Sequence, residues 1–181
     1  MTSPREQLEA MAALFTYPQS DYAKAVEDAV ACSGPAAPAL LEFAGKIRCV
    51  PLSASQELYT STFDLQPSCA LDLGWHLFGE EYERGLLLAR MRRELRACGI
   101  PESRELPDHL SHALLLLARM EPSEAEEFAS AIVAPALERM LKAMPPENVF
   151  GYLLKATRQL VALYFPAAFE PVSPQAEGAM L

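Results

Sequence analysis

The segment Leu106-Pro-Asp-His-Leu110 places a carboxyl group and an imidazole at the start of a leucine-rich stretch. Proline favours the first position of a helix, because its φ is already set and its missing N–H would have no partner there. Asp108 would then lie in the first turn, where the helix dipole stabilises a negative charge. The leucines that follow cover too much of the circumference for a half-exposed helix. The pattern predicts a polar pair at the tip of a buried helix, which suits a recognition site or simple capping.

The histidines of this segment could also bind a metal ion, since imidazole and carboxylate are ligands of zinc and iron. His109 and His112 are three residues apart, directly after Asp108. However, the chain has only three histidines, and its four cysteines form no Cys-x-x-Cys pair. Capping or surface placement is therefore favoured, and we expect no metal and no other cofactor. A small metal- or nucleotide-dependent helical enzyme built around His76, His109 and Asp108 stays open as an alternative.

Other catalytic motifs are missing from the sequence. It contains no Gly-x-Ser-x-Gly elbow and no glycine-rich loop of the kind that binds phosphate. We therefore expect a protein that is not an enzyme.

The stretch from residue 58 to 65 carries two aromatic residues, Tyr59 and Phe63, at a spacing that puts both on one face of a helix. Leu58, Thr62 and Leu65 occupy an adjoining face, which we expect to be the core face. The aromatic pair would then be free to line a binding site. The alternative is that these rings simply pack in the core.

A second pair of rings, Trp75 and Phe78, comes from the next expected helix. We interpret the four aromatic residues as walls of a groove, with Asp64 and Asp108 near its rim. Such a groove would bind a peptide through apolar side chains, and the acids would hold an arginine by bidentate hydrogen bonds.

The charge and hydropathy of the chain limit its partners. Its formal net charge is −9, and 51% of its 181 residues are hydrophobic. Binding along a nucleic acid is therefore not expected, whereas an acidic surface attracts a basic polypeptide. No signal peptide and no apolar run long enough for a membrane span is visible, so we expect a cytoplasmic protein with free thiols.

The residue composition favours helices throughout, because only seven valines and three isoleucines accompany many alanines and leucines. Capping-box patterns stand at Ser3–Glu6, Ser53–Gln56 and Ser123–Glu126. Gly79 should end one helix, and Pro135 should kink or split another. We predict an all-α, single-domain bundle of about eight helices over residues 1–165, followed by a loosely ordered tail at 166–181.

Four motifs occur in a fixed order between residues 57 and 118: Glu57-Leu-Tyr59-x-x-x-Phe63-Asp64, Leu77-Phe78-Gly79, Arg84-Gly85 and Glu105-Leu-Pro-Asp-His-Leu110. In this order and spacing they resemble the cytoplasmic chaperones that mature molybdenum oxidoreductases. The branch they resemble most is the nitrate reductase molybdenum-cofactor assembly chaperone, or delta subunit. The wider family includes chaperones for trimethylamine-oxide and dimethyl-sulfoxide reductases. One departure is Leu115-Leu116, where the family often has a Glu-Phe step.

This resemblance implies an all-helical chaperone that binds the N-terminal leader of a molybdopterin-containing catalytic subunit. It would hold that subunit until the cofactor is inserted, as a monomer or weak homodimer. The leader-binding residues implied by matching position are Tyr59, Phe63, Asp64, Pro107, Asp108, His109 and Leu110. Phe78, Gly79, Arg84 and Gly85 would shape the turn and helix beside them. A helical adaptor or scaffold whose apolar surface serves self-association is the remaining alternative.

Overall fold

A computed structural model describes residues 2–33 and 37–170, and within them every regular element is helical. The α-helices are α1 (Pro4–Ala13), α2 (Tyr22–Ser33), α3 (Pro38–Ile47), α4 (Leu52–Tyr59), α5 (Leu73–Phe78), α6 (Tyr82–Ala97), α7 (Leu110–Leu117), α8 (Pro122–Phe128), α9 (Ala134–Ala143) and α10 (Phe150–Tyr164). The predicted all-α, single-domain bundle is confirmed. The boundary proposed at residue 165 stays a prediction.

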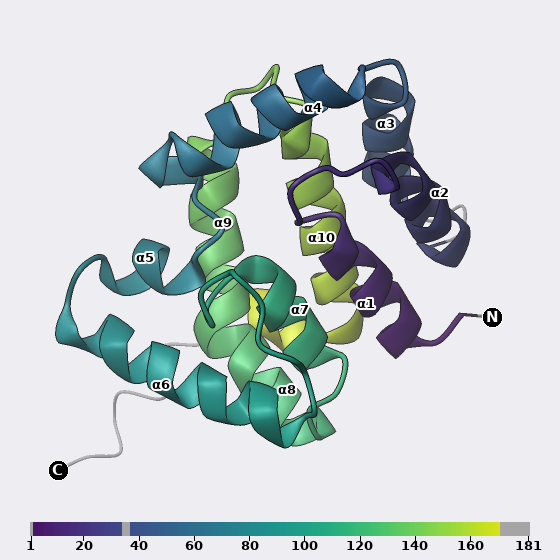
Figure 1. Cartoon of the computed structure of the whole chain (residues 1–181). Helices are drawn as coiled ribbons and strands as arrows, with labels where there is room; N and C mark the ends of the chain where they lie inside the picture. The colour runs from purple at the N-terminus through teal and green to yellow at the C-terminus, as the bar shows by residue number, and fades with distance from the viewer. Residues whose placement is uncertain (1, 34–36, 171–181) are drawn as a thin grey trace, which may run out of the picture.

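Helices α7 and α10 contribute many of the buried residues of the core, and Figure 1 shows where they lie in the bundle. Helix α1 packs on α7 and α2, while α10 packs on α3 and α9. Leu110, Leu114 and Leu116 of α7 are fully buried, as expected for a helix that is apolar around most of its circumference.

Local signals placed some helix ends correctly. Ser3 forms the predicted capping box, in which the Glu6 N–H donates to Ser3 Oγ at 3.2 Å and the Ser3 N–H donates to Glu6 Oε2 at 2.7 Å. Gly79 ends α5 with a φ of 58°, a value that favours glycine. Pro135 is the second residue of α9, and the π-helical segment Ala129–Val133 just before it divides the α-helical run into α8 and α9, which agrees with the predicted split.

The other two predicted capping boxes are wrong. Helix α4 begins at Leu52 after Pro51, and α8 begins at Pro122, in both cases before the expected serine. Neither helix has a side-chain cap hydrogen bond. The prolines explain the difference, because their preset φ starts the first turn earlier than a serine cap would.

The expected helix that carries Trp75 and Phe78 begins only at Leu73, and the helix expected from Pro107 begins later, at Leu110. Residues 67–69 form a 3-10 turn, and an extended strip follows before α5. This strip pairs with the chain ahead of α7: the Leu73 N–H donates to Asp108 O at 2.9 Å, and the Leu110 N–H donates to Leu71 O at 2.8 Å. Because the backbone of residues 108–110 takes part in this pairing, α7 starts at Leu110.

The expected core face of residues 58–65 is correct only in part: Thr62 is 1% exposed and Leu58 is half-buried against the core, but the aromatic pair is buried as well and Leu65 is not. Tyr59 and Phe63 are 4% exposed, whereas Leu65 is 71% exposed. Phe63 packs against Tyr59 and Phe150, with ring centroids 5.0 and 4.9 Å apart. The segment Thr60–Asp64 is π-helical, and its extra residue rotates the following side chains relative to an unbroken α-helix. Leu65 is thereby turned to solvent.

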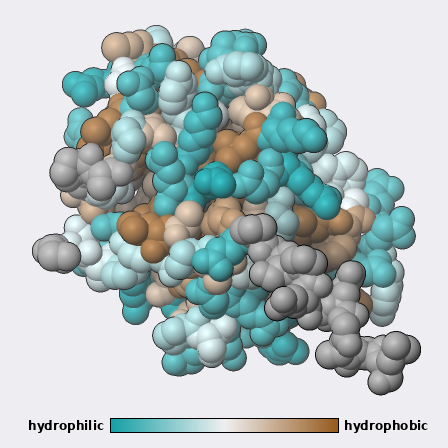
Figure 2. Space-filling model, turned by 180° about the vertical axis from the view of Figure 1, so that it is seen from behind, coloured by the Kyte–Doolittle hydropathy of each residue, from teal (hydrophilic) through white to brown (hydrophobic). Residues whose placement is uncertain are grey.

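Several large apolar side chains are exposed at the surface, in line with the high apolar content. Figure 2 shows apolar patches set between hydrophilic side chains on one face. The exposed large apolar residues are Tyr17, Leu41, Leu52, Leu65, Tyr82, Leu86, Leu106 and Leu163. No helix in the described part of the chain is long and apolar enough to cross a bilayer.

The end of the described chain folds back on the bundle. Pro166–Phe169 form a 3-10 turn, and the Arg158 guanidinium lies 4.8 Å from the centre of the Phe169 ring. The remainder of the expected tail, residues 171–181, lies outside the described residues.

Candidate functional site

Two of the predicted site segments meet at one cavity of about 340 Å³. Tyr59, Phe63 and Asp64 come from α4 and the π-helical segment that continues it, and His109 comes from the start of α7. The residues that line the cavity are Tyr17, Tyr59, Phe63, Asp64, Ala70, Leu71, Asp72, Glu105 and His109. The other predicted residues, Trp75, Phe78, Arg84, Pro107, Asp108 and Leu110, do not line it.

The aromatic wall of the cavity is anchored in the core. The Tyr59 hydroxyl donates to the carbonyl of Phe15 at 3.1 Å, and burial raises its pKa. Its ring meets that of Tyr17 edge to face, with centroids 5.8 Å apart. Tyr17 is 41% exposed, so it is the ring that solvent or a ligand reaches most easily. Sequence reasoning missed Tyr17, which precedes Pro18 in an irregular segment with no motif.

Three carboxyl groups border the cavity: Asp64, Asp72 and Glu105. Asp64 and Glu105 are exposed, and Asp72 is half-buried. Burial raises the pKa of Asp72 to about 6, and the neighbouring Asp108 adds to this, while Arg84 opposes it. Asp72 was missed because it lies in the strip that was expected to be helical. Glu105 belonged to a recognised motif, and its place beside His109 could have been suspected.

His109 is a neutral side chain that caps α7. The Ser111 N–H donates to His109 Nδ1 at 3.3 Å, which leaves the ring proton on Nε2. Nε2 lies 3.9 Å from Glu105 Oε2. Burial lowers the pKa of His109 to about 4, with a further contribution from His112. His109 therefore presents an N–H group, and no positive charge, to the cavity at neutral pH.

Asp108 is not at the rim of the groove, contrary to the expectation, nor is it in the first turn of a helix. Its side chain is fully buried behind the cavity, where its Oδ2 accepts from the Gly74 N–H at 3.1 Å and from Arg84 Nε at 3.3 Å. A Cβ at Gly74 would lie 2.7 Å from the same oxygen, so this approach requires glycine. Asp108 thus ties α5 to the start of α7 and to α6.

Arg84 links Asp108 to the cavity wall. Its Nη2 donates to Asp72 Oδ2 at 3.3 Å, and its guanidinium lies 5.8 Å from the centre of the Trp75 ring. Trp75 and Arg84 therefore support the acidic wall from behind. Pro107 and Leu110 are buried on either side of the Asp108–His109 pair.

The remaining histidines already have hydrogen-bond partners. His112 Nδ1 lies 2.8 Å from the Leu106 carbonyl oxygen, and its Nε2 lies 2.9 Å from Ser103 Oγ. His76 Nε2 lies 2.6 Å from the Ala70 carbonyl oxygen. Within the part of the chain that the structure describes, no group of three His, Cys, Asp or Glu side chains is arranged to hold a metal ion.

The cavity combines three carboxyl groups with the accessible ring of Tyr17. Carboxylates accept bidentate hydrogen bonds from a guanidinium, and an aromatic ring attracts a cation. Ser111 Oγ lies 2.7 Å from His109 Nδ1, but Ser111 is buried and does not line the cavity. The carboxyl groups and the ring suit recognition of a basic group.

Comparison with known proteins identifies the family of the chain. The model of the nitrate reductase delta subunit family matches residues 27–146, and the chain belongs to this family. The probable nitrate reductase molybdenum cofactor assembly chaperone NarW of Escherichia coli strain K12 is 29% identical over 121 residues. The match covers 66% of this chain and 52% of that relative, so it spans about half the length of NarW.

The fold has a counterpart among crystal structures. A protein from Archaeoglobus fulgidus described as a redox enzyme maturation protein superposes with a TM-score of 0.67 at 24% identity. The match covers 89% of this chain and 95% of that one. The family resemblance drawn from the motifs is confirmed. The relatives are named as an assembly chaperone and a maturation protein and not as catalysts, in agreement with the expected absence of enzymatic activity.

Proposed function

We propose that this chain is a cytoplasmic maturation chaperone for a molybdenum-containing oxidoreductase of the nitrate reductase type. It binds the basic N-terminal leader of the catalytic subunit in the cavity between Asp64 and His109 and holds that subunit until the cofactor is inserted. Family membership and the name of NarW support the class of client. The observation that carries the proposal is the convergence of Asp64, Asp72 and Glu105 on one cavity beside Tyr17.

The cavity suits one arginine side chain of such a leader. A planar guanidinium can donate two parallel hydrogen bonds to one carboxylate while its face lies against a ring. Asp64 comes from the segment after α4 and Glu105 from the segment before α7, so the two carboxylates reach the cavity from different parts of the chain. His109 Nε2 lies beside Glu105. The net charge of −9 adds a long-range attraction for a basic segment. Phe78 is half-buried against the core. The residues that support these walls are Trp75, Arg84, Pro107, Asp108 and Leu110.

The test is the affinity for a synthetic peptide that copies the N-terminal leader of a catalytic subunit of the nitrate reductase type from the same genome. We expect Asp64→Asn and Glu105→Gln each to weaken binding by about 1 kcal/mol, the range for exposed charged pairs and charge-assisted hydrogen bonds. Replacing the peptide's arginines with lysine should weaken binding as well, because an ammonium group cannot donate the two parallel hydrogen bonds of a guanidinium. Fluorescence anisotropy of a labelled peptide gives the dissociation constants.

Glu127→Gln is the matched control, because it removes one exposed carboxylate from α8, away from the cavity. If all three variants weaken binding equally, the attraction is only that of net charge. If none does, or if the peptide does not bind, the cavity is not the leader site.

Leader affinity should also depend on pH. With its pKa raised to about 6, Asp72 is ionised at pH 7.5 and mostly protonated at pH 5.5. Acidification therefore removes one negative charge from the cavity, while His109 stays neutral down to about pH 4. We expect affinity for the arginine peptide to fall by about 0.5–1 kcal/mol over this interval. Asp72→Asn should bind more weakly at pH 7.5 and lose most of this dependence; an unchanged pH profile in that variant would contradict the assignment.

A further inference from the structure

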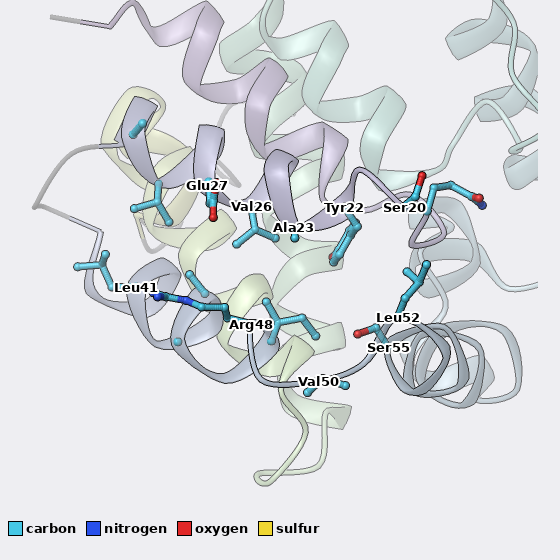
Figure 3. A pocket seen from close by; sticks show the side chains of 16 residues that line it. Ser20, Tyr22, Ala23, Val26, Glu27, Leu41, Arg48, Val50, Leu52 and Ser55 are labelled. Atoms are coloured by element: carbon cyan, nitrogen blue, oxygen red, sulfur yellow. The ribbon is translucent and has the colours of Figure 1, made fainter.

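A second hollow, apart from the acidic cavity, lies between α2 and α3 and has a volume of about 390 Å³. Its walls are mainly apolar, with Val26 and Val30 on α2, Ile47 on α3, and Val50 and Leu52 beyond it. Figure 3 shows Val26 pointing from α2 into the space between the two helices, with Leu52 and Ser55 at the end formed by α4. The leader-binding role proposed for the acidic cavity does not involve this groove.

The dimensions of the groove indicate what it can hold. Its lining on α2 runs from Tyr22 to Ala31, a length of about 14 Å at 1.5 Å per residue. The groove lies between two packed helices, α2 and α3, so an occupant reaches it with a row of side chains. A helix lying over it would supply such a row from positions i, i+3 or i+4, and i+7.

Gly45 keeps part of the groove open. It lies on α3 among the lining residues, and no atom lies within 4 Å of the position that a Cβ would take there. Ala23 and Ala44 line the groove as well and are small. Glycine inside a helix lowers the stability of the helix relative to alanine. Gly45 therefore does not stabilise α3, and what it contributes is space in the groove.

Charged side chains stand on both walls of the groove. Figure 3 shows Glu27 on α2 and Arg48, just beyond α3, on opposite sides of it. Neither side chain belongs to an ion pair among the residues described. An occupant with a cation on one flank of its apolar row and an anion on the other would complement both walls.

The groove and the acidic cavity are neighbours on the same elements. Ser55 lines the groove, and Tyr59, one turn further along α4, lines the cavity. Gln19 lines the groove, and Tyr17, two residues earlier, lines the cavity. Gln56 Nε2 donates to the carbonyl of Pro18 at 2.8 Å, which holds the two elements together. A single polypeptide can therefore reach both sites.

We infer that the α2–α3 groove binds the apolar face of an amphipathic helical segment in the same client polypeptide whose basic residue occupies the acidic cavity. The identity of that polypeptide rests on the proposed function. The chaperone then recognises two features together: a cation at the cavity and an apolar row adjacent to it. Only a segment that carries both at matching separation gains from both sites.

Filling the groove is the direct test. Gly45→Leu places a side chain in open space on a helix, where leucine is favoured over glycine, so the fold should be retained. We expect this variant to bind the leader peptide at least tenfold more weakly than the unmodified chain. Ala23→Leu fills the groove from the opposite wall and should act in the same direction. Thermal unfolding of each variant verifies that it is folded.

Two controls separate blocking from other effects. Gly45→Ala changes helix propensity but fills little space, and Ala89→Leu adds an exposed leucine to α6, outside the groove. Both should bind within twofold of the unmodified chain. A leader peptide with serine in place of its apolar residues should bind more weakly, and Gly45→Leu should not weaken it further.

The outcomes distinguish the two proposals. If Asp64→Asn and Glu105→Gln weaken binding but folded Gly45→Leu and Ala23→Leu do not, the groove inference is overturned and the cavity assignment stands. If the groove variants weaken binding and the cavity variants do not, the groove inference stands and the cavity assignment fails. A leader peptide that does not bind at all overturns both.

Discussion

Replacing Phe63 with alanine is expected to lower the free energy of unfolding by about 3–5 kcal/mol, the range for removing a buried phenylalanine. Phe63 is 4% exposed, and its ring packs against Tyr59 and Phe150 and meets Phe15 at 6.5 Å. Removing it leaves a void at the centre of this aromatic cluster, since the rings around it are held from other helices. Urea denaturation followed by circular dichroism measures the change.

Leu65→Ala is the matched control, because Leu65 lies two residues further on and is 71% exposed. It should change the free energy of unfolding by about 0.5 kcal/mol or less. The sequence pattern alone would place Leu65 in the core. Comparing Phe63→Ala with Leu65→Ala therefore tests which face of this segment is buried. A larger loss for Leu65→Ala than for Phe63→Ala would show that the buried face of this segment is the other one.

Arg84→Met is expected to cost about 3 kcal/mol in stability, because it leaves the Asp108 carboxylate buried without its counter-charge. Asp108 is fully buried, and its Oδ1 has no hydrogen-bond partner among the described residues. Methionine keeps most of the length of the arginine side chain, so the loss reports chiefly on the charge. Adding Asp108→Asn to Arg84→Met should recover part of the stability, because the unpaired charge is then removed.

Arg92→Met provides the comparison on the same helix, since Arg92 is exposed and belongs to no ion pair in the part of α6 described here. It should leave stability within about 0.5 kcal/mol. If Arg84→Met behaves like Arg92→Met, the Arg84–Asp108 pair does not hold α5, α6 and α7 together. Loss of leader binding in a folded Arg84→Met variant would further indicate that Arg84 positions Asp72 at the cavity.

The distinction between supporting and contacting residues changes how variants of this family should be interpreted. Asp108 and Tyr59 both fall within the recognised motifs, but Asp108 is enclosed and the Tyr59 hydroxyl is bonded to the backbone. Substituting either would reduce binding mainly by disturbing the walls. Asp64, Glu105 and Tyr17 are exposed at the cavity, and they are the positions where affinity can change while the fold is retained.

The sequence by itself determined the helical class, several helix ends and the family. These features depend on signals that act within a few residues. Ser3 and Glu6 close a capping box across one turn, Gly79 supplies a positive φ, and Pro135 cannot donate a helix hydrogen bond. The four family motifs are likewise short runs, readable without knowing which side chains meet.

Tertiary structure alone decided which side chains form the site. The strip at residues 71–73 left the helix because its backbone found partners at 108–110, more than thirty positions away in the chain. That pairing brought Asp72 to the cavity and enclosed Asp108 behind it. The aromatic face of residues 59–63 turned inward because Phe15 and Phe150 fill the other side of the cluster. Helical periodicity specifies that side chains share a face, but the partners that bury the face come from distant helices.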